Sequence, residues 1–334
     1  MTKVYLVRHA EAEGNAYRRI HGQYDSLLTE FGLQQVAALR EWFADIPVDA
    51  CFSSDQHRAC KTAQAVYLAK GLPLIPDRRF REVHLGRWED IPFGYLERFE
   101  KRDMDMFNYD DKNWHVDGSE TWTEYTDRFL AGLNERCAQQ EGKTIAIFAH
   151  ACVLRGLQKR ILKTDDLPFC ENTSVTCLHW NDGEISFEFL NRASHLTPEL
   201  STPVRQQRLK QGATDRADFC LWFEKTADET ESYFAKLRDK TIGRVAFGEG
   251  SAPHEGVIFD LSLDEPYRGR HFGQQLLGQA ICTLRERGVK RLQTAVPEQN
   301  TGAMQFFREN GFLEQEHREN RTVLEKDIEV RKLP

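Results

Sequence analysis

Three short apolar runs in the first half of the chain each lead to a basic side chain. Residues 4–7, 50–53 and 144–149 have the pattern of buried strands. Longer stretches with apolar residues at helical spacing lie between them, such as the one that Thr29 can cap and that extends to Phe43. Strands that alternate with helices predict an α/β fold with a mostly parallel sheet.

The basic residues after these runs are expected to meet at one edge of that sheet. They are Arg8 and His9 after the first run, Arg58 after the second and His150 after the third. Ligands of α/β proteins gather at the carboxyl ends of the strands. Guanidinium groups bind a phosphate dianion through paired hydrogen bonds, and an imidazole can attack phosphorus. Taken singly, each residue is more often structural, so the prediction depends on the whole set.

The motifs around these residues resemble those of the histidine phosphatase superfamily, which includes the cofactor-dependent phosphoglycerate mutases. In chain order they are residues 6–11 with Asn15, 23–29 with Gly32, 53–59 with Thr62 and Ala63, 81–89, 148–151 with Leu154 and Arg155, and 191–196. Every motif stands in the family's order. The resemblance implies a phosphoglycerate mutase-like sheet with flanking helices.

The resemblance also implies a role for each matching residue. His9 would attack the phosphate, and Glu82 would protonate the leaving oxygen and then act as a base toward water. The phosphate would be bound by Arg8, Asn15, Arg58 and His150, and no metal would be needed. This division agrees with the chemistry, because the leaving alkoxide needs a proton and cationic groups stabilise the transferring phosphate.

The sequence departs from the family pattern after both histidines. Ala10 and Ala151 stand where glycine is usual, which should alter the pocket shape more than the activity unless the backbone needs a positive φ. Residues 90–120 are compact, whereas the resemblance implies longer insertions in the mutases. We therefore expect net hydrolysis of a small phosphomonoester, with mutase-type phosphotransfer as the alternative. Residues 103–111 are acidic and aromatic-rich and predict part of a capping insertion.

A polar stretch with two prolines separates this half from a second set of elements. It covers residues 194–211 and contains Pro198 and Pro203. We therefore predict a phosphatase domain at residues 1–197, a linker at 198–211 and a smaller α+β domain at 212–334. The later part has strand patterns at residues 242–247, 257–263 and 291–296, and helical patterns at 272–284 and 303–310.

Residues 267–273 form a predicted turn before the first of these helices and contain two glycines. A helix that begins after such a turn can bind a pyrophosphate. This turn, with residues 300–303, 306–307 and 311–312, resembles the GNAT N-acetyltransferase family from about residue 243 onward. The resemblance implies acetyl-coenzyme A as cofactor. Its expected binding residues are Arg268, Gly269, Arg270, His271, Phe272, Gly273 and Asn300.

Two departures from the family pattern affect the expectation of acetyl transfer. His271 stands where the loop usually has glycine, and Phe307 stands where many members have the tyrosine that protonates the departing thiolate. We expect the acetyltransferase-like architecture more firmly than acetyl transfer, which would also need an amine acceptor. The alternative is a non-catalytic sensor of acyl-coenzyme A.

Composition limits the location and the partners of the chain. Its 334 residues exceed a typical single core. The net charge of −7 argues against general affinity for nucleic acid or anionic membranes. No apolar run is long enough to cross a bilayer, and the eight cysteines lack zinc-ligand spacing. We expect a cytoplasmic protein with reduced thiols and no metal, and leave its oligomeric state open.

Overall fold

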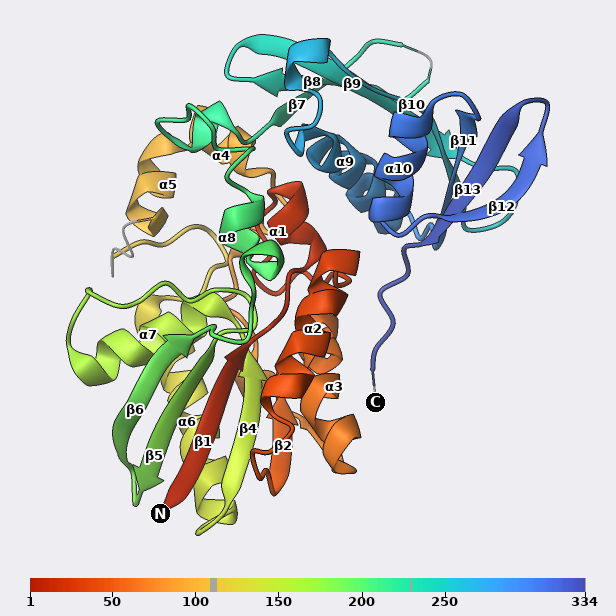
Figure 1. Cartoon of the computed structure of the whole chain (residues 1–334). Coiled ribbons are helices and arrows are strands. Elements are labelled where there is room, and N and C mark those ends of the chain that lie inside the picture. Colours follow the sequence, from red (N-terminus) through yellow and green to blue (C-terminus); the bar gives the residue numbers. More distant parts are fainter. Residues whose placement is uncertain (109–112, 229, 334) are drawn as a thin grey trace.

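The computed structural model describes residues 1–108, 113–228 and 230–333 and contains two sheets flanked by helices (Figure 1). The first sheet has the order β3-β2-β4-β1-β5-β6. Its strands are β1 (Thr2–Arg8), β2 (Ala50–Ser53), β3 (Leu74–Pro76), β4 (Thr144–Ala149), β5 (Val175–Asn181) and β6 (Glu184–Arg192). The first four are parallel, which confirms the predicted α/β class, while β5 runs antiparallel to β1 and β6 antiparallel to β5.

Helices cover both faces of this sheet. The faces are covered by α2 (Glu30–Trp42), α3 (His57–Lys70), α6 (Trp122–Gln139) and α7 (Ala151–Leu162). The helices α1 (Glu13–Tyr17), α4 (Phe93–Phe99), α5 (Lys101–Asn108) and α8 (Thr202–Arg205) lie beyond the carboxyl ends of the parallel strands (Figure 1). Successive side chains of a strand point to opposite faces. Val4 and Leu6 therefore pack with α6 and α7, whereas Tyr5 and Val7 pack with α2 and α3. Thr29 caps α2 as expected, since its hydroxyl accepts from the N–H of Gly32.

The strands β5 and β6 form a hairpin whose turn includes Asp182 and Gly183. Asp182 and Gly183 have φ values of 48° and 89°. Two central residues with positive φ are typical of the tight turns that match the twist of a hairpin. The hairpin places β5 beside β1, so the strand that carries Arg8 and His9 lies between β4 and β5.

The second sheet has the order β12-β13-β11-β10-β9-β8-β7. Its strands are β7 (Trp222–Lys225), β8 (Ser232–Leu237), β9 (Lys240–Glu249), β10 (Glu255–Leu263), β11 (Arg291–Pro297), β12 (Leu313–Arg318) and β13 (Arg321–Asp327). Its helices are α9 (Phe272–Glu286) and α10 (Thr301–Glu309). β10 and β11 are parallel and the other pairs are antiparallel. This is the smaller α+β unit that the sequence predicts.

The two halves share a packed contact. Tyr17 of α1 belongs to the hydrophobic cluster of the second sheet and lies against Gly278 of α9. A Cβ at Gly278 would lie 2.4 Å from Cγ of Tyr17, so this close approach requires glycine. Glu13 of α1 is buried and pairs with Arg285 of α9 at 2.9 Å. The helix after the His9 loop is thus anchored in the second half of the chain.

The stretch predicted as a linker contains structure of its own. Residues 202–205 form α8, and Leu209 is 2% exposed within the core of the second half. Of the predicted capping insertion, residues 109–111 lie outside the described residues, and α5 includes residues 103–108. No helix of the described ranges is long and apolar enough to span a bilayer.

Candidate active site

The first predicted site lies at the carboxyl end of β1. His9 is 4% exposed, and its Nδ1 lies 2.7 Å from the carbonyl oxygen of Ala10. Because a carbonyl oxygen only accepts hydrogen bonds, Nδ1 carries the proton and donates it. The lone pair of Nε2 therefore stays free. The ring has the tautomer that a nitrogen nucleophile needs.

Burial and positive neighbours keep this ring neutral. Desolvation lowers the pKa of His9 well below 6.5, and the guanidinium groups of Arg58 and Arg8 lower it further. His150 at the start of α7 is fully buried, and its pKa is lowered first by burial and then by Arg58. The two imidazole centroids are 5.1 Å apart. Neither ring nitrogen of His150 has a hydrogen-bond partner among the described residues, so its N–H can donate to a bound anion.

Backbone carbonyls hold the two arginines in place. Arg58 is fully buried; its Nη2 donates to the carbonyl of Gly22 at 2.7 Å, and its Nη1 lies 3.6 Å from Asp25. Arg8 donates through Nη1 to the carbonyl of Cys170 at 2.6 Å. The Nε of each arginine is buried without a partner in the described ranges. An unpaired buried N–H costs free energy unless a ligand accepts from it, so both side chains suit a bound anion.

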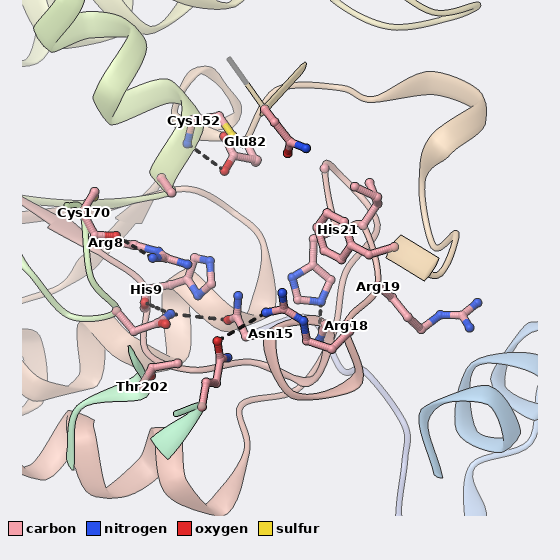
Figure 2. Close-up of a pocket in the computed structure, with 18 of the residues that line it drawn as sticks. Arg8, His9, Asn15, Arg18, Arg19, His21, Glu82, Cys152, Cys170 and Thr202 are labelled. Atoms are coloured by element: carbon pink, nitrogen blue, oxygen red, sulfur yellow. Dashed lines mark hydrogen bonds between the residues drawn. The ribbon is translucent and has the colours of Figure 1, made fainter. Parts of the chain in front are cut away.

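Glu82 lies on the α7 side of the same cavity, while Arg8 and His9 lie on the β1 side (Figure 2). Its Oε1 accepts from the N–H of Val153 at 3.1 Å and its Oε2 from that of Cys152 at 3.1 Å. These N–H groups belong to the first turn of α7, where they have no partner within the helix. The helix end therefore fixes the position of the carboxyl group.

The remaining predicted residue, Asn15, belongs to α1. Its Oδ1 accepts from the N–H of Ala12 at 3.0 Å and from Nδ2 of Asn172 at 3.4 Å. Neither Ala10 nor Ala151, the two substitutions for glycine, has a positive φ. Alanine at these positions therefore adds a methyl group without backbone strain.

One cavity of about 660 Å³ is lined by five of the six predicted residues. These are Arg8, His9, Asn15, Arg58 and Glu82. His150 lies behind them, against the His9 ring. Among the described residues that line the cavity, Glu82 carries the only carboxylate. The arrangement can hold a phosphate dianion beside a neutral imidazole, with one carboxyl group within the same space.

Sequence reasoning missed a second set of lining residues. Arg18 and His21 follow α1, Phe107 and Asn108 end α5, and several side chains come from beyond residue 198. The last group consists of Thr202, Pro203, Gln206, Lys210, Arg216 and Phe219. The basic residues of the linker were the available signal, but a polar stretch with prolines more often indicates a solvated connection.

The second predicted site lies between β10 and α9. Gly269 and His271 have φ values of 68° and 62°, so His271 adopts the left-handed conformation in which glycine is favoured. His271 is also the N-cap of α9, and its side chain makes no capping hydrogen bond. The N–H groups of the first turn are thus left without a side-chain cap. The N–H of Gln274 donates to the carbonyl oxygen of His271 at 3.3 Å, while those of Phe272 and Gly273 remain available for a phosphate.

The arginines of this loop are partly engaged. Arg268 donates through Nε to the carbonyl of Leu263 at 2.9 Å, and Arg270 donates through Nη2 to that of Gln211 at 3.3 Å. The Nε of Arg270 is buried without a partner among the described residues. Asn300 accepts from the N–H of Ala303 and so caps α10. The loop therefore fits a pyrophosphate through its backbone and guanidinium groups, while Asn300 also has a local role.

The parallel strands beside the loop separate along their length. β10 and β11 pair from Glu255 with Arg291 to Ile258 with Thr294, and no later pair is formed along these two described strands. Beyond that point each strand keeps its other neighbour, β9 or β13. The facing backbone groups are free for an extended, amide-containing arm such as that of coenzyme A.

Phe307 occupies the position of the expected tyrosine. It is 5% exposed and packs edge-to-face with Phe306 and Phe312. It has no hydroxyl group, so it cannot protonate a thiolate. The structure thus combines a loop that fits the cofactor with an apolar side chain at the acid position.

Comparisons with known proteins agree with both halves. Residues 4–193 match the histidine phosphatase superfamily (branch 1), and residues 196–312 match the acetyltransferase (GNAT) family. The probable phosphoglycerate mutase GpmB of Escherichia coli (strain K12 / DH10B) is 33% identical over 173 residues, which are 48% of this chain and 75% of the relative.

Two solved structures show the same first-half fold. YhfR of Bacillus stearothermophilus has a TM-score of 0.56 at 28% identity and covers 58% of this chain and 99% of its own. A mycobacterial glucosyl-3-phosphoglycerate phosphatase has a TM-score of 0.53 at 24% identity, covers 57% of this chain and 99% of its own, and supports the fold alone. The chain therefore belongs to the histidine phosphatase superfamily and carries a GNAT-family domain after it.

Proposed function

We propose that this protein hydrolyses phosphomonoesters through a phosphohistidine intermediate on His9. The observation that carries the proposal is the state of the His9 ring. It is neutral, protonated on Nδ1 and free on Nε2, and it lies in a cavity with two arginines that have unpaired N–H groups. An uncharged nucleophile beside fixed cations suits attack on a phosphate dianion.

The proposed reaction has two steps. In the first, Nε2 of His9 bonds to phosphorus, the bond from phosphorus to the alcohol oxygen breaks, and Glu82 gives its proton to the departing oxygen. In the second, water bonds to phosphorus, its proton passes to the Glu82 carboxylate, and the phosphorus–nitrogen bond breaks. Arg8, Arg58 and His150 bind the phosphate oxygens throughout.

Two substitutions test these roles on aryl and alkyl phosphates. His9→Ala should lose hydrolysis of both classes by a factor on the order of 10⁴ or more, because no nucleophile remains. Glu82→Gln should slow alkyl phosphates by about 10² to 10⁴, but 4-nitrophenyl phosphate far less, because its leaving group needs no proton. Steady-state rates on folded variants, with the radiolabelled phosphoenzyme trapped in acid-free gels, provide the measurement.

Three outcomes would contradict the proposal. Undiminished turnover by folded His9→Ala would exclude this nucleophile, and an equal loss on both ester classes in Glu82→Gln would give Glu82 a structural role. Transfer of phosphate between positions of phosphoglycerate, with little release of inorganic phosphate, would favour the mutase alternative. The similarity to GpmB of Escherichia coli, a probable phosphoglycerate mutase, supports that alternative.

We also propose that the second half binds acetyl-coenzyme A through residues 268–273 and Asn300. The left-handed turn, the uncapped first turn of α9 and the separation of β10 from β11 support binding. Acetyl-coenzyme A would supply an activated acetyl thioester there. Since Phe307 lacks a hydroxyl group, binding can persist without transfer, as in the sensor alternative.

Calorimetric titration of the full chain with acetyl-coenzyme A tests this second proposal. Arg268→Ala should weaken binding by about tenfold, because one charge-assisted hydrogen bond to the pyrophosphate is lost. Arg318→Ala, on the exposed strand β12, removes the same charge and should leave binding unchanged. The proposal fails if the wild-type protein gives neither heat nor thermal stabilisation at roughly millimolar ligand.

A further inference from the structure

Three basic side chains, Arg18, Lys210 and Arg216, line the phosphatase cavity but play no part in the proposed reaction. They come from different parts of the chain: the residue after α1, the predicted linker, and the start of the second half. Arg18 and Arg216 are partly buried, and Lys210 lies exposed at the rim. Two of the three follow residue 198, so the second half of the chain completes this wall of the cavity.

Aromatic rings gather the three cations. The Arg18 guanidinium carbon lies 5.0 Å from the ring centroid of Phe219 and 5.6 Å from that of Phe93. Arg216 lies 5.0 Å from the Phe93 centroid, and the Lys210 ammonium 5.7 Å from that of Phe219. Cation–π contacts fix the positions of the cations, but they do not neutralise them.

No carboxylate of the described residues lies within salt-bridge distance of these three cations. The hydrogen bond that Arg18 makes to a side chain goes to the neutral amide of Gln206. Glu97 is the carboxylate whose charge affects Arg216, but it pairs with Lys101 instead. Buried N–H groups remain without a partner in the described ranges, Nε in Arg18 and Nη1 in Arg216.

The cations therefore repel one another. Partial desolvation of Lys210 beside the aromatic rings lowers its pKa, and the charges of Arg18 and Arg216 lower it further. Burial likewise lowers the pKa of Arg216, with Arg18 as the next cause. Like charges that are held together without a counter-ion destabilise a fold, whereas an anion between them would remove the penalty. The other cavity arginine near this wall, Arg19, differs in this respect because Asp90 pairs with it at 2.7 Å.

We propose that Arg18, Lys210 and Arg216 form a second anion subsite, which binds a phosphate or carboxylate group carried by the same molecule whose phosphate ester lies at His9. This proposal rests on the proposed phosphatase function and narrows its substrate class to phosphomonoesters with a second, remote anionic group. A small neutral alcohol phosphate would leave this wall without a counter-charge. The 660 Å³ cavity spans both groups, so one molecule can contact both.

Paired substrates test the subsite. Straight-chain diol bisphosphates of increasing length are compared with the ω-hydroxyalkyl monophosphates of the same length. The bisphosphate of the best-fitting length should have a kcat/KM about tenfold to a hundredfold above its monophosphate, as expected for hydrogen bonds to charged groups. The same preference should appear as a difference in Kd when the pair is titrated into His9→Ala protein, which does not depend on turnover.

Substitutions then show which side chains cause the preference for bisphosphates over monophosphates. Arg216→Met keeps an apolar stem on Phe93 and should reduce the bisphosphate preference at least about tenfold. Lys210→Met, at an exposed position that does not threaten folding, should reduce it less. Arg208→Met removes a charge from the same segment outside the cavity lining and should leave the preference unchanged.

The outcomes separate the two proposals. Equal kcat/KM and equal Kd for both members of every pair would overturn the subsite while leaving the phosphatase intact. Loss of the preference in Arg208→Met to the same extent as in Arg216→Met would also overturn the subsite. So would a kcat/KM for the monophosphate that, with free inorganic phosphate added, equals the kcat/KM for the bisphosphate. No turnover of any phosphomonoester, with the Kd preference retained in His9→Ala, would overturn the phosphatase alone.

Discussion

His9 and His150 are buried at the phosphate site, and His21 lies half-buried beside the same cavity. Burial lowers the pKa of each well below 6.5, and nearby arginines lower it further. Nε2 of His21 accepts the N–H of Gly14 at 2.7 Å, which requires an unprotonated nitrogen. The same burial that prepares His9 for attack thus has a cost at low pH.

This burial predicts that the protein loses stability as the pH falls below about 6.5. The unfolded chain then protonates these histidines while the folded protein does not, so unfolding takes up protons and the free energy of unfolding decreases. The slope should reach about 1.4 kcal/mol per pH unit for each histidine. Urea unfolding at a series of pH values between roughly 7.5 and 5 measures it.

A substitution at His21 tests how much this histidine contributes to the pH dependence of the free energy of unfolding. His21→Gln should remove about one proton from the slope, whereas His115→Gln changes an exposed histidine and serves as the control. Burial raises the pKa of Asp77, but hydrogen bonds from Arg79 and Arg136 outweigh it and lower the pKa to about 2. Asp77 therefore loses its contribution to the free energy of unfolding only below about pH 4 and does not affect this range. An unchanged slope in His21→Gln would mean that this ring is protonated in the folded state.

Only some of the residues expected at the phosphate site lie next to a strong local pattern, whereas Asn15 and Glu82 were expected from the family resemblance alone. Arg8, His9 and His150 follow buried strands, and a parallel sheet brings strand ends together whatever their separation in sequence. Arg216 carries no such signal. It begins a 3-10 helix of three residues, Arg216–Asp218, and the contact of its guanidinium group with Phe93 holds it at the cavity.

The contact between α1 and α9 depends on one position without a side chain. Gly278→Ala would place a methyl group 2.4 Å from Tyr17. Alanine favours a helix over glycine by about 1 kcal/mol, but overpacking costs about 1–3 kcal/mol. We expect net destabilisation, together with a lower kcat/KM for phosphomonoesters because α1 carries Asn15. Thermal unfolding and steady-state kinetics measure the two effects.

Gly302→Ala is the matched control in α10. The nearest atom to its added methyl group would be an Asn300 side-chain oxygen at 4.0 Å, so the substitution should stabilise the protein by about 0.5–1 kcal/mol. If both glycine substitutions stabilise the protein equally, the α1–α9 contact is looser than the distances indicate.

Buried elements were predicted from sequence with nearly correct ends, whereas exposed ones were missed. β2 and β4 begin and end where their apolar runs do. Every residue of β12 is exposed, including Leu313 at 70%, so it has no alternation of buried and exposed positions to detect. β7 and β8 are short and mostly half-exposed. The predicted division at residues 197, 211 and 212 stays a prediction.

The chain as a unit carries a net charge of −7, yet the described lining of the cavity at His9 contains seven arginine and lysine side chains against one carboxylate. Net charge argued against nucleic acid and membranes, but it could not reveal a local basic site. That site draws residues from both halves, and Tyr17 of the first half belongs to the core of the second. A phosphatase fused to an independent neighbour would show neither feature.

This shared cavity has a consequence for biosynthesis. Translation completes the first sheet well before Lys210, Arg216 and α9 leave the ribosome, and N-terminal domains generally fold first. During that interval the nascent chain would hold His9 in a cavity that is open on one side, with Tyr17 uncovered. Full-length synthesis therefore closes the cavity. Under the proposed phosphatase function, a chain that is terminated early would accept a wider range of esters, and its uncovered Tyr17 would favour aggregation.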